Sequence, residues 1–321
     1  MIFAASLAAA VVIVVLSATA LALWYERKLA ARMQTRIGPQ FVGPIGLFQP
    51  VADLLKLVQK EEIVPMGADR VLFALAPPLT VIFALAAAAF VPLWPGVAVV
   101  RSDVGVLLVI GFGGLAMVPV WMAGWASFNK YALLGAMRAV AQSISYGVPL
   151  VLAAMVPVIL AGTMDLDGIT QFQATHHWFG LWPIIPGLPA FILFLLAMLA
   201  ESNRIPFDIP EAESELVAGV TTEYTGMQFG FVYLAEYVHT VVGAAIGSVM
   251  FLGGWDGPFA PGLHWLLLKT LCLFTFIYWI RWTLVRLRAD QLMTLCWKWL
   301  VPAGLGLVFL SAAWNQTGWS R

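Results

Sequence analysis

Residues 1–24 read MIFAASLAAAVVIVVLSATALALW and contain no charged side chain. A helix of about 20 apolar residues is long enough to cross the hydrocarbon core of a bilayer, which is about 30 Å thick. The stretch lacks the basic start and the clear cleavage site of a secretory signal peptide. We therefore expect residues 2–24 to form a retained membrane-spanning helix.

Apolar runs of similar length recur along the rest of the chain. The 321 residues are 61% hydrophobic and only 11% charged, with a mean hydropathy of +0.90, whereas soluble domains are about 25% charged. We predict an all-α, polytopic integral membrane protein that forms a single membrane domain over residues 1–321. The eight expected spans cover residues 2–24, 71–94, 104–125, 140–163, 184–200, 228–252, 264–285 and 298–316.

The loops between these expected spans differ in charge. Loops rich in Lys and Arg tend to stay in the cytoplasm. The even-numbered loops hold only Arg101, so we expect the odd-numbered loops in the cytoplasm and both termini on the outer side. The basic residues of the odd-numbered loops are Arg27, Lys28, Arg32, Arg36, Lys56, Lys60, Arg70, Lys130, Arg138, Arg204, Arg286 and Arg288.

Several smaller features indicate packing and not chemistry. The two cysteines, Cys272 and Cys296, are too few for an iron–sulfur cluster, which takes about four such ligands. We expect them to be packed or lipid-facing thiols. Glycines four residues apart at 226–230 and 243–247 predict close approach of helices, and GFGG at 111–114 has the same interpretation. A net charge of zero gives no indication of a nucleic-acid partner.

The first loop contains an amphipathic stretch, FQPVADLLKLVQKEE, at 48–62. Its apolar residues recur at the spacing of one helix face, and its charges lie on the other side. This pattern predicts a helix at the membrane surface. Two interpretations stay open: the helix seals one edge of a cavity, or it is a plain interfacial anchor. The apolar face consists of Val51, Leu54, Leu55 and Val58, and the charged side of Asp53, Lys56 and Lys60.

The fifth loop is unusually acidic. Only 17 residues of the chain are Asp or Glu, yet six lie within 201–223, where AESNRIPFDIPEAESELVAG begins at residue 200. Pro206 and Pro210 prevent a regular helix there. Glu211 and Glu215 are expected to share the face of a following helical turn. Carboxylates crowded near low dielectric should have raised, coupled pKa values, and Arg204 can keep one of them ionised.

Another acid, Glu236, falls inside the sixth expected span. An ionisable group at that depth predicts a functional site, and His239 shares its helix face. His176 and His177 are expected in an outer surface loop. Three classes fit these residues: a proton-coupled transporter, a membrane subunit of a redox pump, or a passive scaffold. The first half shows no counterpart to the 200–219 break, which argues against the inverted repeats typical of transporters.

Five motifs resemble one family over almost the whole chain. The chain is similar to the H subunits of the bacterial proton-pumping NADH:quinone oxidoreductase, respiratory complex I. The blocks at 25–65 and 200–237 are highly specific. The motifs are YERKLAARMQTRIGPQFVGPIGLFQPVADLLKLVQKEEIVP at 25–65, AGWASFNKYALLGAMRAVAQSISY at 123–146, AESNRIPFDIPEAESELVAGVTTEYTGMQFGFVYLAEY at 200–237, FLGGW at 251–255 and RLRADQLMTLCWK at 286–298.

The resemblance implies two functional regions. One is the membrane part of a quinone chamber and its entrance, at Arg27, Arg32, Arg36, Gly38, Pro39, Asp53 and Lys56. The other is an acidic path that links quinone chemistry to proton pumping, at Glu201, Asp208, Glu211, Glu213, Glu215, Glu223 and Glu236, with Arg204 and His239 as charge partners. The alternative for these acids is a docking patch for the hydrophilic arm. Replacing Glu213 or Glu223 by Gln should reduce quinone reduction and pumping together.

The resemblance also implies partners and a location. We expect quinone as substrate, with NADH, FMN and iron–sulfur clusters on other subunits. The chain itself is predicted to bind no cofactor or metal and to be inactive alone. Partners would be the quinone-site subunits of the hydrophilic arm, the other membrane-arm subunits and lipid, in the inner membrane of a bacterium. The alternative is the equivalent component of a related complex that takes electrons from ferredoxin or another donor.

The chain departs from the family pattern where the family has polar or acidic residues. Ala132 and Gly147 stand where family members have Glu, and Gln40-Phe41 and Val220-Thr221 replace Asn-Arg and Tyr-His. Neither Ala nor Gly can carry a proton. Two hypotheses follow: protons use another route, through Glu236, His239 and water, or the coupling is reduced.

Overall fold

The computed structural model describes residues 2–176, 184–211 and 213–316, which form helices and loops without a β-strand. Seven helical segments in these ranges are long and apolar enough to cross a membrane. They are Ala8–Met33 within α1 (Ile2–Met33), α3 (Arg70–Ala88), α4 and α5 together (Gly105–Leu115, Met117–Ala126), α6 (Lys130–Ala161), α10 (Gly226–Phe251), α11 (Leu263–Thr283), and Ala289–Gln316. The all-helical, polytopic prediction is therefore confirmed.

The remaining elements are shorter. The apolar helix α8 (Ile184–Glu201) corresponds to the fifth expected span, at 184–200, and its apolar part covers Pro186–Glu201. Since this part is shorter than the other seven, the count of eight spans stays a prediction. The other short elements are η1 (Pro44–Gly46), α2 (Gln49–Gln59), α7 (Leu166–Thr175), α9 (Glu213–Leu216) and η2 (Gly219–Thr221), and Ala289–Gln316 divides into α12 (Ala289–Thr294), a π-helical turn (Leu295–Leu300) and α13 (Val301–Gln316).

Several predicted helix ends were wrong. The first helix continues from the predicted residue 24 to Met33, and the fourth begins at Lys130 and not at 140. Apolar runs stop at the first charges, but Lys, Arg and Glu are good helix formers, so the helices extend beyond the apolar zone. Arg27, Arg32 and Arg138 therefore lie on helices and not in loops. The third span is interrupted at Ala116, between α4 and α5.

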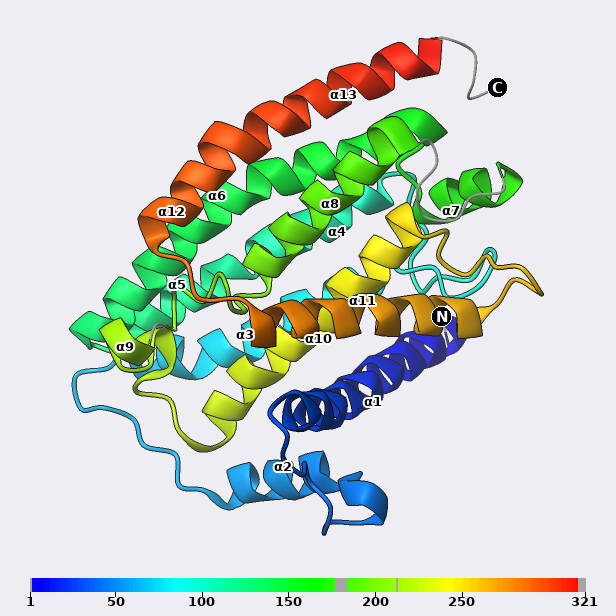
Figure 1. Cartoon of the computed structure of the whole chain (residues 1–321). Helices are drawn as coiled ribbons and strands as arrows, with labels where there is room; N and C mark the ends of the chain where they lie inside the picture. Colours follow the sequence, from blue (N-terminus) through cyan, green and yellow to red (C-terminus); the bar gives the residue numbers. More distant parts are fainter. Residues whose placement is uncertain (1, 177–183, 212, 317–321) are drawn as a thin grey trace.

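The helices are arranged around α6 and α10 (Figure 1). Helix α6 packs against α5, α8 and α13, while α10 packs against α1, α3 and α11. The glycine pair at 243–247 packs as predicted, because a Cβ at Gly243 would meet Met198 and one at Gly247 would meet Phe194, both on α8. The packing predicted for GFGG at 111–114 was wrong for Gly111 and Gly114, where a Cβ would meet nothing within 4 Å. Of the two free cysteines, Cys296 is buried and Cys272 is exposed.

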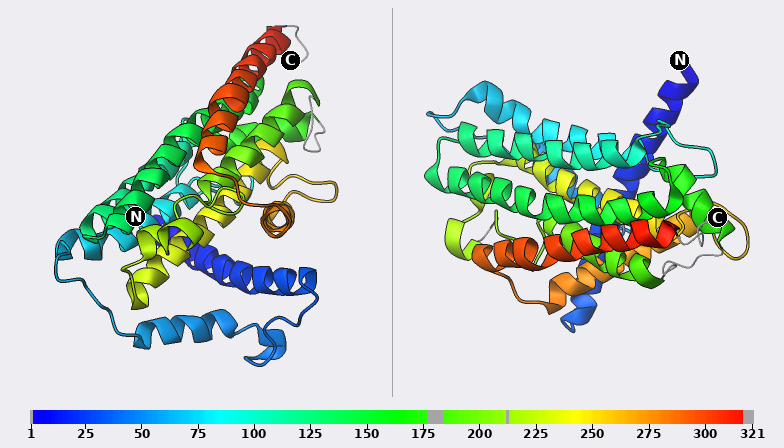
Figure 2. Two further views of the ribbon diagram at one scale, coloured as in Figure 1. Left: turned by 60° about the vertical axis from the view of Figure 1, so that its left-hand side comes forward. Right: turned by 90° about the horizontal axis from the view of Figure 1, so that it is seen from above.

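Helix α2 is the predicted amphipathic helix of the first loop. It lies beside the ends of α1 and α10, at the margin of the bundle (Figures 1 and 2). Leu57 contacts Gly230 of α10, while Val51, Leu54, Leu55 and Val58 are each about half exposed. An exposed apolar face of this kind needs lipid or a partner to cover it.

Candidate functional site

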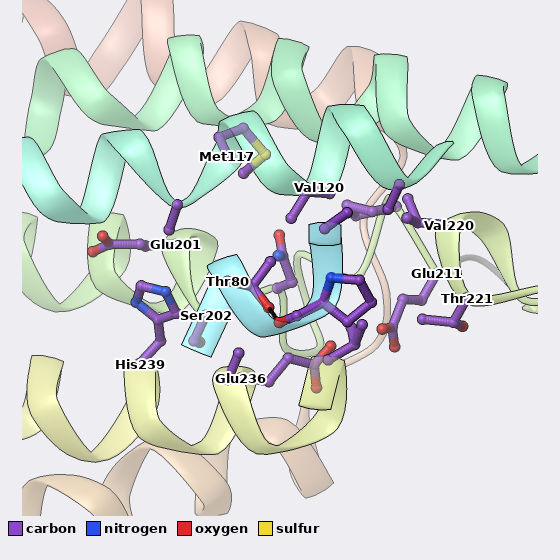
Figure 3. Close-up of a pocket in the computed structure, with 18 of the residues that line it drawn as sticks. Thr80, Met117, Val120, Glu201, Ser202, Glu211, Val220, Thr221, Glu236 and His239 are labelled. Atoms are coloured by element: carbon purple, nitrogen blue, oxygen red, sulfur yellow. Dashed lines mark hydrogen bonds between the residues drawn. The ribbon is translucent and has the colours of Figure 1, made fainter. Parts of the chain in front are cut away.

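A cavity lies between α3, the α4–α5 junction, α6, the end of α8 and α10 (Figure 3). It encloses about 780 Å³ of space outside atoms, part of it open to solvent. We call residues 202–225, between α8 and α10, loop five; this segment closes one end of the cavity. The titratable side chains that line the cavity are Tyr146, Glu201, Glu211, Glu236 and His239.

Loop five is held in place from three sides. Helix α8 ends at Glu201, and the two prolines of the loop prevent its continuation. The buried Gln142 side chain of α6 donates from Nε2 to the carbonyl oxygens of Ala200 (2.7 Å) and Phe207 (2.9 Å). The backbone amide of Leu287 donates to the carbonyl of Pro206 (2.9 Å). The helix break predicted after the fifth span is therefore present, and its backbone at Pro206 and Phe207 is fixed by these bonds.

Glu211 and Glu236 form a carboxyl pair at the loop-five end of the cavity. Burial, the charge of Glu236 and a hydrogen bond to it raise the pKa of Glu211 well above its usual range. Burial also raises the pKa of Asp208, against the positive charge of Arg286. Two carboxyls that share a hydrogen bond in low dielectric hold one proton between them. The pair can thus store and release a proton.

Arg204 is the charge partner of this pair. Its guanidinium is 4% exposed, lies 3.3 Å from Oε2 of Glu236 and stacks 4.5 Å from the ring centre of Tyr237. The positive charge of Arg204 also acts on Glu211, whose pKa it lowers, but burial and Glu236 outweigh this effect. Loop five and α10 thus meet at one buried electrostatic centre.

A second buried ion pair lies on the other side of Tyr237. Glu26 of α1 is 5% exposed and accepts hydrogen bonds from Arg281 of α11 and from the Tyr237 hydroxyl. That hydroxyl is also 3.2 Å from the hydroxyl of Tyr233. Sequence reasoning missed Glu26 because it placed the residue in a loop. The sequence does contain an indication of its position, because the good helix formers that follow the first apolar run predict that the helix continues through Glu26.

The remaining acids of loop five have separate environments. Glu215 is exposed and accepts a hydrogen bond from Arg138, while Glu223 accepts one from Asn129 at 2.5 Å. Glu211 and Glu215 do not share a helix face, because α9 begins only at Glu213; that prediction was wrong. The side chain of Glu213 lies outside the described residues, as does His177.

The first-loop residues form a surface around α2. Nη1 of Arg27 lies 2.5 Å from Oδ2 of Asp53, which joins α1 to α2, and Gln49 donates to the same carboxylate at 2.9 Å. Arg32, Arg36 and Lys56 are exposed. Gly38 packs against the backbone of α1 next to Pro39, where a Cβ would lie 3.2 Å from the carbonyl oxygen of Arg27.

Two of the positions that depart from the family pattern line the cavity, and the others do not. Ala132 is fully buried on α6, whereas a side chain at Gly147 would meet nothing within 4 Å. Val220 and Thr221 line the cavity directly. No group of His, Cys, Asp and Glu suited to a metal ion occurs within the described part of the chain.

Comparison with known proteins identifies similar chains. Residues 6–312 match the family described as NADH dehydrogenase. The H subunit of NADH-quinone oxidoreductase from Rhodospirillum rubrum is 44% identical over 316 residues, which cover 96% of this chain and 92% of the relative. The H subunit from Thermomicrobium roseum is 44% identical over 91% of both chains. That from Dehalococcoides mccartyi strain CBDB1 is 43% identical over 90% of this chain and 80% of the relative.

Proposed function

The chain belongs to the NADH dehydrogenase family, and we propose that it is the membrane component through which an NADH-quinone oxidoreductase links quinone reduction to proton translocation. In this proposal it is a single membrane domain of a bacterial inner membrane, with both termini on the outer side. NADH, FMN and iron–sulfur clusters belong to other subunits. The chain contributes to the oxidoreductase activity only within the complex.

The proposed quinone chamber lies beside α1, α2 and α10. Its membrane side would be the exposed apolar face of α2, and its charged rim the Arg27–Asp53 pair with Arg32, Arg36 and Lys56. A protein of the hydrophilic arm would complete it. The exposed apolar face of α2 supports a quinone chamber here, because the apolar tail of a quinone can cover it in the same way as lipid chains.

The observation that carries the proposal is the position of Tyr237. Its hydroxyl binds Glu26, and its ring contacts Arg204, which pairs with Glu236. Quinone reduction consumes protons and changes the charge in its chamber. In the proposed mechanism, a charge change at the Glu26–Arg281 pair alters the bond to Tyr237 and displaces Arg204 relative to Glu236. The proton shared by Glu236 and Glu211 then moves.

Replacing Tyr237 by Phe tests this link, because the ring stays and only the hydroxyl is lost. A hydrogen bond to a charged group contributes about 1.5–3 kcal/mol, and about 1.4 kcal/mol is a factor of ten. We expect quinone-linked NADH oxidation to fall at least about tenfold, after normalisation to NADH oxidation by a water-soluble acceptor. Tyr233→Phe is the matched control. Equal quinone-linked rates in the two variants would refute the link.

A second candidate function is that of a membrane subunit in which quinone reduction is less tightly coupled to proton translocation. Ala132 and Gly147 favour it, because neither carries a titratable group where the family pattern has Glu. Proteoliposomes that contain the purified complex would be supplied with NADH and a quinone and followed with a pH-gradient dye. Inhibitor-sensitive electron transfer without dye quenching would favour this candidate. A purified complex that lacks an NADH-binding flavoprotein would favour a different electron donor.

A further inference from the structure

The cavity has a second end, away from the Glu211–Glu236 pair. Figure 3 shows Glu211 and Thr221 at one end of the cavity and His239 with Glu201 at the other. Glu236 extends from the same helix as His239. Titratable groups are therefore spread along the cavity and not gathered at one point.

His239 and Glu201 are both positioned by helices. His239 follows Glu236 by three residues on α10, which is about 4.5 Å of rise and places both side chains on one face. Glu201 is the last residue of α8, and its carboxyl occupies the space that a side chain at position 113 would fill. Gly113 of α4 therefore makes room for the carboxyl group.

Other groups face this end of the cavity from each neighbouring helix. Tyr146 of α6 interacts electrostatically with Glu201 and hydrogen-bonds to Ser143. Thr80 of α3 lines the cavity, but its hydroxyl is bonded to the carbonyl of Pro77 (2.6 Å). Ser202 and Asn203 also line the cavity, and the hydroxyl of Ser202 donates to the carbonyl of Leu199 (3.0 Å). The apolar lining side chains include Ala116, Val120, Ala123 and Val232. Among the described lining residues, His239 is the only basic side chain, and it lies at the Glu201 end of the cavity.

We propose that His239 relays protons between Glu236 and Glu201. This inference rests on the proposed function, because the relay accepts the proton shared by Glu211 and Glu236 and carries it further along the cavity. The Glu236 carboxylic acid gives its proton to one imidazole nitrogen and becomes a carboxylate. The imidazolium then releases a proton from its other nitrogen to the Glu201 carboxylate. Each transfer runs directly or through cavity water, and the imidazole returns to its neutral form.

The relay explains how protons cross the cavity without acids at 132 and 147. An imidazole can accept and release a proton at different atoms, whereas the apolar lining can do neither. The cavity also has room for water, which needs two to four polar partners. The carboxyls of Glu236 and Glu201 with the imidazole of His239 supply such partners along its length.

The test is His239→Asn, which keeps a polar planar side chain but removes the titratable imidazole. His264→Asn, on the exposed start of α11, makes the same chemical change away from the cavity. The intact complex is reconstituted in liposomes, and dye quenching is compared at equal rates of quinone-linked NADH oxidation. We expect His239→Asn to lose at least half of the protons moved per electron, and His264→Asn to match the wild type.

Infrared difference spectra between the oxidised and reduced complex give an independent readout. Imidazole bands that appear in the wild type and in His264→Asn should be absent from His239→Asn. If the wild type shows no dye quenching at all, the proposed coupling function is wrong, and the spectra still decide whether His239 exchanges protons. Undiminished quenching in His239→Asn, or unchanged imidazole bands, would overturn the relay.

Discussion

Breaking the Arg204–Glu236 pair should loosen loop five by a large and calculable amount. Arg204→Met keeps the apolar stem and removes the charge. Removing one partner of a buried ion pair costs about 3–5 kcal/mol, and the exposures of 4% and 13% place this pair in that class. The contact of the Arg204 guanidinium with the Tyr237 ring contributes up to about 2 kcal/mol. This amount is not simply added to the cost of breaking the ion pair, because both contacts involve the same guanidinium. We expect the free energy of local opening to fall by about 3–5 kcal/mol.

Amide hydrogen exchange measures this opening. The amide of Leu287 is a suitable reporter because its acceptor is the carbonyl of Pro206 in loop five. Since about 1.4 kcal/mol is a factor of ten, its exchange in Arg204→Met should be faster by about two to three and a half orders of magnitude. Adding Glu236→Gln should recover part of the loss, because the carboxylate then no longer lies buried without its partner.

Arg138→Met is the matched control for this experiment. It breaks an ion pair with Glu215 whose side chains are 35% and 48% exposed, and such pairs contribute about 0–1 kcal/mol. Exchange at Leu287 should therefore change less than about sixfold. Equal acceleration in Arg138→Met and Arg204→Met would refute the assignment of Arg204 as the anchor of loop five.

Two further outcomes follow from the same structure. Because the pKa of Glu211 is raised in the folded state, protonated Glu211 stabilises loop five. This stabilisation is fully present below pH 4.5 and is lost as the pH rises through the folded-state pKa. Glu211→Gln should therefore flatten the pH dependence of amide hydrogen exchange in loop five. Gly219→Ala should lower the melting temperature of the complex at least twice as much as Gly162→Ala. Both have positive φ, which costs about 1–2 kcal/mol for Ala, but only at 219 would the Cβ lie 1.8 Å from a carbonyl oxygen.

The spans could be predicted because the bilayer imposes its thickness on each helix. The ends of the helices could not, because charged residues such as Arg27 and Lys130 continue a helix beyond the apolar zone. The break at Ala116 follows neither a proline nor a charge. The side-chain contacts between distant residues could not be predicted from the sequence either, since Glu26 and Arg281, for example, are 255 positions apart. Only the packing of α1 against α11 brings them together.

The acidic density of loop five does not by itself make a coupled set of acids. Glu215 lies four residues after Glu211, yet its pKa is lowered by the hydrogen bond and charge of Arg138, whereas that of Glu211 is raised by burial and by Glu236. The partner of Glu211 comes from the next helix, 25 residues away. The turn after Pro210 therefore divides neighbouring carboxylates between the surface and the cavity. Substituting acids one by one along this stretch should accordingly give two classes of effect, with Glu211 grouped with Glu236 and not with Glu215.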